Sequence, residues 1–328
     1  MLTNFPNGLQ AFPVIGGNLV DFFGADNTFF VDGDLGSDGQ DGKSPVGAKL
    51  TIQGAVDAGN ANSTIYVKVM KVTAGSTDPA SYTENVIIPV AKSGMKIIGV
   101  SVNRTQGGLP QLKVGTTTTA ALITVRAPNF TIANMGINGI GGTGGGILLD
   151  DDGSTKIANG FSAINCHFKN CVGTTATNAA TGGAIQWAAT GGAWQALIKS
   201  NRFYKNVGDV VLKGTSQTVP QDVVIEDNVF SGPAASVDCN LYLSGGSGMN
   251  GVIIRNNTFT AFPAIAGTNV MNISATGCTG SMTGNFFAVS GKTYGAAGNN
   301  LIPTTLLMAG NFQGVAAGAG ATGEIGRT

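Results

Sequence analysis

A short phrase recurs along the chain and constrains its fold more than any other feature: Asn, one further residue, then an aromatic residue. Clear copies are Asn201-Arg202-Phe203, Asn228-Val229-Phe230 and Asn257-Thr258-Phe259. Cys166-His167-Phe168 carries Cys in place of Asn, and Asn311-Phe312 lacks the middle residue. Recurrence of one phrase at a near-regular spacing is typical of repeat architectures, in which each copy is one structural unit.

The spacing and the residues between copies select the kind of repeat. The apolar position recurs with steps of 25 to 35 residues, at the following sites: Ile137, Phe168, Phe203, Phe230, Phe259, Phe287 and Phe312. Between copies lie short β-rich runs such as 222–225 and 251–254, separated by Gly, Asn and Ser, which read as strands. No intervening stretch has ten or more residues of helical apolar periodicity, which argues against helix-containing solenoids. The sequence therefore predicts an all-β, single-stranded, right-handed parallel β-helix.

In such a solenoid each copy forms one coil of short strands, and coils stack at the strand spacing of about 4.8 Å. We expect Phe203, Phe230 and Phe259 to touch in one column, each contributing roughly 1.5–3 kcal/mol by burial. The Asn of each copy suits a tight turn, and stacked amides can also bond one another. Further coils are expected upstream, at 96–102 and 122–132.

The ends of the chain differ from its middle. We expect an extended arm over 1–28, the β-helix over 29–313 and a Gly/Ala-rich tail over 314–328. The stretch 49–58 is the best helix candidate, with Ile52, Ala55 and Val56 on one face, and it would cover the first coil because a solenoid end needs a cap. The tail is expected either to be disordered or to be ordered by a neighbour.

Composition excludes several classes of function. Only 11% of the residues are charged and the formal net charge is zero, so nothing predicts nucleic-acid binding. The longest apolar runs fall far short of a membrane span, and the N-terminus lacks the pattern of a secretory signal. Four cysteines without CxxC spacing are interpreted as buried thiols, with a disulfide as the less favoured alternative, and they suit a protein made in a reducing cytoplasm.

Two segments carry resemblances to known families. The stretch 29–45, followed by Leu50-Thr51-Ile52-Gln53-Gly54-Ala55-Val56, resembles the opening of pectate-lyase-like parallel β-helix proteins. This resemblance implies the fold and no particular activity, because the fold hosts lyases, hydrolases and structural proteins. The stretch 2–17 is similar to the start of tailed-phage virion proteins that carry a β-helix behind such a leader. Its apolar residues are candidates for docking, either on the chain's own β-helix or on a neighbouring subunit or capsid protein: Phe5, Leu9, Phe12 and Ile15.

Candidate catalytic residues are few. The calcium site and base of the polysaccharide lyases have no counterpart that we can map onto this sequence. An inverting glycosidase needs two carboxylates roughly 6.5–9.5 Å apart, and the best candidates are Asp209, Glu226 and Asp227, which also fit surface turns. The only histidine, His167, is expected to point away from Phe168 and to face solvent.

Two further groups of residues leave alternatives open. The acidic loop 32–41 contains four Asp; they could bind calcium, although no bidentate Glu follows, or they could form turns. Trp187 and Trp194 are assigned to the longest loop between coils. There they could stack on sugar rings or on a partner protein, or they could cover the core.

These observations favour a structural protein of a bacteriophage particle that decorates or reinforces the capsid. The resemblance implies a homotrimer, the major capsid protein or another virion protein as partner, and a place in the virion after assembly in the host cytoplasm. On this hypothesis the chain is not an enzyme and needs no cofactor. The alternative is a tailspike-type β-helix that binds or degrades glycans, and a third hypothesis is a glycan-binding module with Trp187 and Trp194 exposed side by side.

Overall fold

A computed structural model describes most of the chain between residues 27 and 325. The described ranges are 27–72, 74–75, 79–100, 108–151, 158–173, 182–187, 194–213, 220–231, 240–244, 249–261, 271–273, 278–289, 305–314 and 323–325. The arm residues proposed for docking (Phe5, Leu9, Phe12 and Ile15) lie outside these ranges, and so does Cys239.

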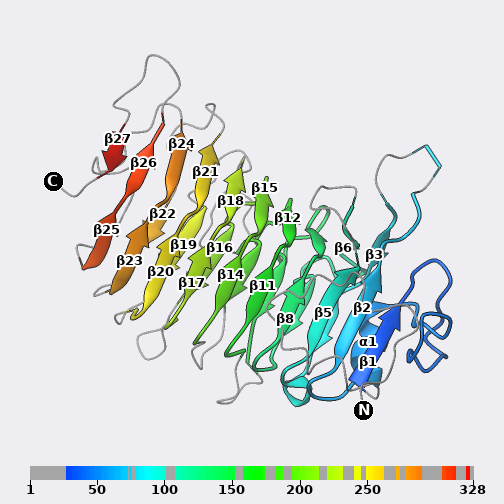
Figure 1. Ribbon diagram of the computed structural model, residues 1–328. Helices are drawn as coiled ribbons and strands as arrows, with labels where there is room; N and C mark the ends of the chain where they lie inside the picture. Colours follow the sequence, from blue (N-terminus) through cyan, green and yellow to red (C-terminus); the bar gives the residue numbers. More distant parts are fainter. Residues whose placement is uncertain are drawn as a thin grey trace, which may run out of the picture.

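The described strands form three long sheets that run along a right-handed solenoid (Figure 1). The first sheet contains β1 (Thr28–Val31), β2 (Thr64–Lys68), β5 (Lys96–Val100), β8 (Thr131–Ala133), β11 (Ser162–Ile164), β14 (Leu197–Lys199), β17 (Val224–Glu226), β20 (Val252–Arg255), β23 (Gly280–Thr283) and β25 (Leu306–Ala309).

The second sheet follows the first in each coil. It contains β3 (Ser81–Thr83), β6 (Gln111–Lys113), β9 (Gly136–Asn138), β12 (His167–Lys169), β15 (Arg202–Tyr204), β18 (Val229–Ser231), β21 (Thr258–Ala261), β24 (Phe286–Val289), β26 (Asn311–Gln313) and β27 (Gly323–Ile325).

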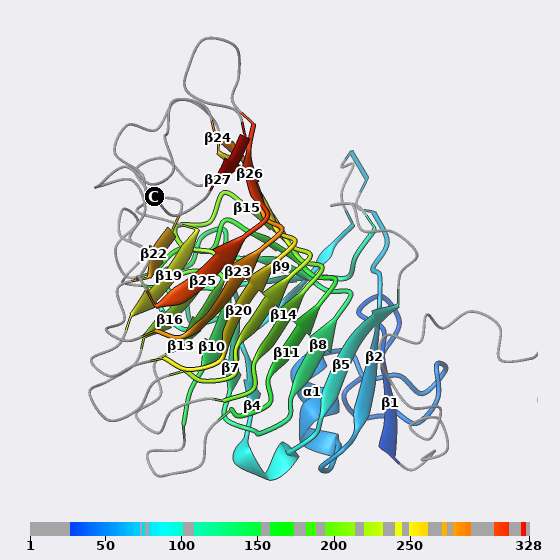
Figure 2. The ribbon, with the colours of Figure 1, turned by 60° about the vertical axis from the view of Figure 1, so that its left-hand side comes forward.

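The third sheet closes the coil. It contains β4 (Val86–Ile88), β7 (Ile123–Val125), β10 (Ile147–Leu149), β13 (Ile185–Trp187), β16 (Val210–Lys213), β19 (Leu241–Ser244) and β22 (Met271–Ile273). The chain thus passes from first to second to third sheet and rises one strand per circuit, as Figure 2 shows from the side. This arrangement confirms the predicted parallel β-helix, including the coils expected upstream of the Asn phrases.

A column of stacked phenylalanines fills the core behind the second sheet. Neighbouring ring centroids of Phe168, Phe203, Phe230, Phe259 and Phe287 are 4.7–5.0 Å apart and nearly parallel. All five side chains are fully buried. The rings stack because each occupies the same inward position on successive strands, as the repeat spacing predicts.

The last phrase departs from this column. Phe312 pairs in register with Phe286 on the outer face, whereas Gln313 pairs with Phe287. Side chains alternate between faces of a strand, so the missing middle residue shifts the aromatic ring by one position and turns it outward. The expectation that Phe312 continues the core column is therefore wrong, and its ring is half exposed.

A second column, of asparagines, lies at the turn between the first and second sheets. Each amide nitrogen donates to the Oδ1 of the Asn on the next coil: Asn201 to Asn228 at 3.1 Å, then Asn257 at 3.0 Å, Asn285 at 3.0 Å and Asn311 at 2.8 Å. All five are buried. Left-handed backbone is adopted by the residue before the column, such as Asp227 (φ 57°) and Gly284 (φ 64°), so the column Asn itself is free to bond along the stack.

The N-terminal end is closed by the predicted helix, α1 (Ile52–Ala58), whose buried residues are Ile52, Ala55 and Val56. Its first backbone N–H groups are satisfied by side chains from outside the helix. Glu84 accepts from Ile52 and Gln53 at 2.8 and 2.9 Å, and Thr51 Oγ1 accepts from Gly54. The helix packs against β1, β2 and β4 and so covers the first coil as expected. A single 3₁₀ turn, Val90–Lys92, follows β4.

The C-terminal end is closed differently. Strand β27 lies within the stretch expected to be a tail and pairs antiparallel with β26 of the same chain. Part of the tail is therefore ordered by its own β-helix, which neither expectation for the tail included. Three cysteines, Cys166, Cys171 and Cys278, are buried free thiols, as predicted.

Candidate functional site

A row of polar side chains runs along the corner where the chain leaves the third sheet and enters the first. At this corner one residue per coil adopts left-handed backbone, among them Gln195, Asp222 and Gly251 (φ 63°, 53° and 71°). The residues that directly precede these left-handed residues are at least partly exposed and stack, one per coil, in a row that we call the corner row. Its members, in stacking order, are Asn159, Trp194, Gln221, Asn250 and Thr279.

Neighbouring members of the corner row are held together by hydrogen bonds and bridges. Asn159 Oδ1 accepts from the backbone N–H of Trp194 at 3.0 Å, and Trp194 pairs with Gln221 in a parallel bridge. Thr279 Oγ1 lies 2.9 Å from Asn250 Oδ1 and donates to it. The row therefore has one side chain per coil, and those of Asn159, Asn250 and Thr279 are held by hydrogen bonds.

Trp194 is the large apolar member of the corner row, and 45% of its surface is exposed. Amide and hydroxyl side chains flank the indole along the stack, and all of them reach the surface at least partly. An exposed aromatic face offers apolar area and a ring N–H, while amides both donate and accept hydrogen bonds. This combination suits a ligand that has apolar faces and many hydroxyl groups.

Two further rows lie beside the corner row, on the outer face of the first sheet. The apolar row contains Leu197, Val224 and Ile253, paired in register and partly exposed. Two residues further along the same strands, Lys199, Glu226 and Arg255 form the charged row. Together the corner, apolar and charged rows form a continuous surface, which we call the outer strip. No described helix or strand crosses it in Figures 1 and 2.

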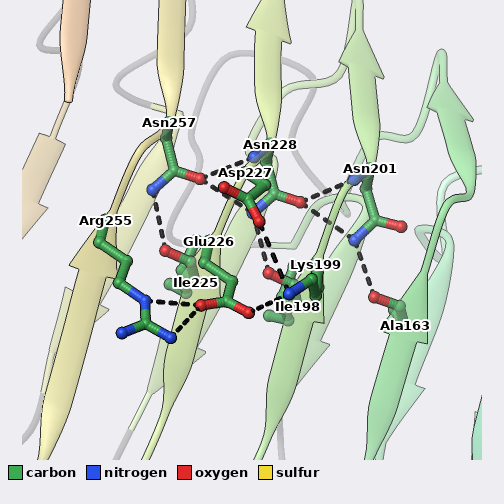
Figure 3. A network of polar contacts seen from close by, with 10 residues as sticks. All are labelled: Ala163, Ile198, Lys199, Asn201, Ile225, Glu226, Asp227, Asn228, Arg255 and Asn257. Atoms are coloured by element: carbon green, nitrogen blue, oxygen red, sulfur yellow. Dashed lines mark hydrogen bonds and ion pairs between the residues drawn. The ribbon is translucent and has the colours of Figure 1, made fainter. Parts of the chain in front are cut away.

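The charged row is a ladder of ion pairs centred on Glu226 (Figure 3). Lys199 Nζ lies 2.7 Å from Glu226 Oε1, and Arg255 Nη2 and Nε lie 2.5 and 2.6 Å from Glu226 Oε2. The hydrogen bond from Lys199 is the main cause that lowers the pKa of Glu226, and the same bond raises the pKa of Lys199. Glu226 therefore stays ionised at neutral pH.

No two of the three candidate catalytic carboxylates, Asp209, Glu226 and Asp227, face each other as a hydrolytic pair would. Asp227 follows Glu226 directly and reaches the same Lys199 at 3.6 Å. Asp209 precedes β16 of the third sheet and is buried, whereas Glu226 lies on the outer face of the first sheet. The prediction assumed that residues on neighbouring coils lie close together. Residues on different sheets of the coil, such as Asp209 and Glu226, face different directions.

Asp209 belongs to an internal polar network instead. Its carboxylate accepts hydrogen bonds from the amide nitrogens of Asn206 at 2.9 Å and Asn240 at 2.5 Å. Burial raises the pKa of Asp209 to about 7, and the two amide bonds only partly oppose this shift. The carboxyl group therefore titrates in the neutral range while enclosed by protein.

His167 points outward from β12, opposite to Phe168, but it is only 6% exposed. The expectation that it faces solvent is wrong, because this part of the second sheet has a buried outer face: Gln111, Asn138 and Lys169 are buried there too. Burial is the main cause that lowers the pKa of His167, and together with the positive charges of Lys169 and Arg202 it brings this pKa to about 4. The imidazole is thus neutral at physiological pH.

The two tryptophans do not form a joint binding surface. Trp187 ends strand β13 and points into the core, with only 3% of its surface exposed. Its assignment to a loop is wrong because the strand extends through it, and burial leaves it no contact area for a ligand. Trp194 alone fits the predicted role of an exposed ring.

The acidic loop 32–41 uses its carboxylates on its own backbone and on nearby side chains. Asp32 Oδ1 accepts from the N–H groups of Asp34 and Leu35, and its Oδ2 pairs with Lys68 at 2.6 Å. Asp38 accepts from the backbone of Leu50 and from Thr51. These bonds support turn formation over calcium binding, and among the described residues no cluster of three or more potential metal ligands is formed. Nor does any described helix have the length and apolar character to span a membrane.

Sequence reasoning missed the corner row, apart from Trp194, and also missed the apolar row. The signal that could have found the corner row is a polar residue followed by Gly or Asp shortly before three strands of the first sheet: Asn159-Gly160, Gln221-Asp222 and Asn250-Gly251. Because the side chains differ from coil to coil, the row has no common residue type and becomes visible only once the coils are aligned.

Comparisons with known proteins identify similar folds. No protein-family model and no curated protein matches the chain. A pectin methylesterase from carrot is 13% identical, with a TM-score of 0.49, and covers 89% of this chain and 83% of that chain. A pectin methylesterase from Aspergillus niger is 12% identical, with a TM-score of 0.44 and coverage of 89% and 86%. The rice weevil pectin methyl esterase is 13% identical, with a TM-score of 0.41 and coverage of 82% and 87%.

The proteins whose structures this fold resembles are enzymes, which stands against the expectation that this chain is not an enzyme. At 12–13% identity they show the fold alone and assign neither a substrate nor a reaction to this chain. The chain is thus similar in fold to pectin methylesterases, as a pectate-lyase-like parallel β-helix.

Proposed function

We propose that this protein recognises a linear glycan laid along the outer strip, as a tailspike-type carbohydrate-binding β-helix would. The observation that carries the proposal is the exposed indole of Trp194, set in a row of amide and hydroxyl side chains. The apolar row beside it supplies partly exposed aliphatic area for the non-polar faces of sugar rings.

The geometry of the stack supports an extended ligand in particular. Corner-row side chains repeat at the strand spacing of about 4.8 Å, so successive units of a polymer meet successive side chains. The hydrogen bonds that already hold Asn159, Asn250 and Thr279 also limit the entropy that binding costs. A small molecule would use only one or two of these positions.

The test is a binding assay that uses the two tryptophans as separate reporters. Trp187 is buried and Trp194 is exposed, so a Trp187→Phe variant reports on the outer strip alone. We expect a linear polysaccharide, from a panel including a β-1,4-glucan, xylan and methyl-esterified polygalacturonate, to shift the emission of Trp194 to shorter wavelength. Trp194→Ala should weaken binding about tenfold or more, as for a central aromatic contact.

Ile87→Ala is the matched control. Ile87 is also 45% exposed but lies on β4 of the third sheet, and its removal should leave binding unchanged. The proposal fails if no polymer of the panel binds, or if Trp194→Ala binds as tightly as the unaltered protein. Incubation of each polymer with the protein, followed by assay of reducing ends and methanol, measures whether the bound glycan is also changed.

A second candidate is a role within a phage particle, where the chain would form a homotrimer and contact the major capsid protein. It is favoured by large apolar side chains that stay exposed on the last coils: Phe286, Leu307 and Phe312. Light scattering of the purified protein tests it. We expect a trimer that a Leu307→Ser, Phe312→Ser double variant converts to a monomer, and a monomeric unaltered protein would contradict it.

A further inference from the structure

The outer strip contains two basic side chains in its described part, and both are engaged. Lys199 and Arg255 bind the two oxygens of the same carboxylate, Glu226. Asp227 adds a second negative charge near Lys199, at 3.6 Å. Two positive and two negative charges therefore meet, and the charged row together with Asp227 has no net charge.

This balance matters for the ligand because glycans come in neutral and acidic forms. A uronic-acid polymer carries carboxylates, which proteins hold through charge-assisted bonds from Arg or Lys. Here such a ligand would meet Lys199 and Arg255 with their charge already balanced by Glu226 and Asp227, or it would have to displace Glu226 from one of them. Only 8% of the Glu226 side chain is exposed, so displacement would leave a poorly solvated, unpaired carboxylate beside the ligand, which is costly.

The remaining rows of the strip offer no other charge for an acidic ligand. The corner row consists of amides, a hydroxyl and an indole, and the apolar row of aliphatic side chains. Such groups hydrogen-bond to hydroxyls and cover ring faces. They match a sugar without a carboxylate.

We infer that the outer strip selects neutral glycans over uronic-acid polymers, with Glu226 as the residue that sets this preference by pairing with both cations and offsetting their charge. The inference rests on the proposed function and adds the substrate class to it. Glu226 acts through Lys199 and Arg255 and is a specificity-determining residue of the binding surface.

The experiment compares two matched pairs of polymers that have the same sugar backbone and differ at C6, where one member carries a carboxylate and the other does not. One pair is methyl-esterified polygalacturonate and its de-esterified form, and the other is a β-1,4-glucan oligomer and its C6-oxidised form. We expect the neutral member to bind about tenfold more tightly, the size of one charge-assisted hydrogen bond. Glu226→Gln keeps the side-chain shape but releases the charge on Lys199 and Arg255, so it should raise affinity for the acidic member about tenfold and lose the preference.

Two further variants keep the result interpretable. Arg255→Gln removes a cation and should weaken acidic binding further, while Asp57→Asn removes an exposed carboxylate on α1 and should change neither affinity. Tighter binding of the acidic member by the unaltered protein, or an unchanged preference in Glu226→Gln, overturns the inference and leaves the proposed function standing. If neither member of either pair binds, and the full polysaccharide panel also fails, the proposed function itself falls.

Discussion

Two polar ladders lie two residues apart on the same coils (Figure 3), and they differ in burial and in charge. The inner ladder consists of buried asparagines such as Asn228, whose amide bonds to Asn257 and to the carbonyl of Ile198. The outer ladder is the charged row around Glu226, whose partners Lys199 and Arg255 are about half exposed. The inner ladder completes the backbone hydrogen bonding of the turns, whereas the outer ladder consists of ion pairs on the outer face of the first sheet.

The difference teaches where this fold can carry function. A buried group that loses its partner costs its full desolvation penalty, so the inner ladder and the phenylalanine column tolerate little change. The two cations of the outer ladder are about half exposed, and ion pairs with solvated partners contribute little to stability, so substitutions that leave no unpaired carboxylate in the outer strip should not unfold the protein. The comparison therefore predicts a steep gradient of effects from the core to the surface.

The largest effect is expected at the phenylalanine column. Phe230 stacks on Phe203 at 4.9 Å and on Phe259 at 4.7 Å, and Phe230→Ala should lower the free energy of unfolding by about 3–5 kcal/mol. Denaturant titration measures this loss. Phe312→Ala serves as the control, because its ring points outward, and it should cost less than about 0.5 kcal/mol. Equal losses at the two positions would mean that the register shift at the last coil is wrong.

The next effect concerns the inner ladder. Asn228→Ala leaves the backbone N–H of Asn201 and the carbonyl of Ile198 without the side-chain partners they have at 2.9 and 2.8 Å. Each buried orphan costs about 1–3 kcal/mol, so the loss in unfolding free energy should reach roughly 3 kcal/mol. A loss of unfolding free energy no greater than that of Glu226→Gln would contradict the claim that the inner ladder contributes more to stability than the outer ladder.

Because of Asp209, the free energy of unfolding should fall as the pH rises, which is the opposite of the effect of a carboxylate whose pKa is lowered by folding. Its folded-state pKa is raised to about 7 from 3.8 by burial, so the folded protein holds a proton that the unfolded chain has released. The stabilisation is full below about pH 4 and is lost as the pH rises through about 7, at no more than about 1.4 kcal/mol per pH unit. Unfolding between pH 4 and 8 measures this slope, which Asp209→Asn should flatten. An unchanged slope in Asp209→Asn would show that the carboxyl does not titrate in the folded state.

The smallest effect on stability is expected at the outer ladder. Glu226→Gln should change the free energy of unfolding by less than about 1 kcal/mol at pH 7, because Lys199 and Arg255 remain solvated. The pKa of Glu226 is lowered in the folded state, so its small contribution is present above about pH 4.5 and is lost in acid. A loss comparable to that of Asn228→Ala would mean that the charged row is part of the core.

Much of the architecture could be predicted from the sequence because the core repeats. Phe203, Phe230 and Phe259 occupy one inward position per coil, and that identity of residue type reveals the coil length. The capping helix was predictable for the same reason, since Ile52, Ala55 and Val56 share one face. Burial selects residue type strongly, so the interior leaves a readable pattern.

The surface left a weaker pattern, and predictions failed there. His167 is on the outward face as expected but is covered, which alternation along one strand cannot reveal. Trp187 is in the core because β13 extends through it. The corner row escaped notice since Asn159, Trp194 and Gln221 share a place in the stack without sharing a side chain.

One paired measurement tests the separation of a structural core from a glycan-binding surface most directly. In Trp194→Ala, unfolding free energy and affinity for the polysaccharide identified in the panel are determined in the same preparation. We expect the unfolding free energy to stay within about 0.5 kcal/mol of the unaltered protein while affinity falls about tenfold or more. A variant that loses stability to the same extent as Phe230→Ala, or that keeps full affinity, would contradict the account.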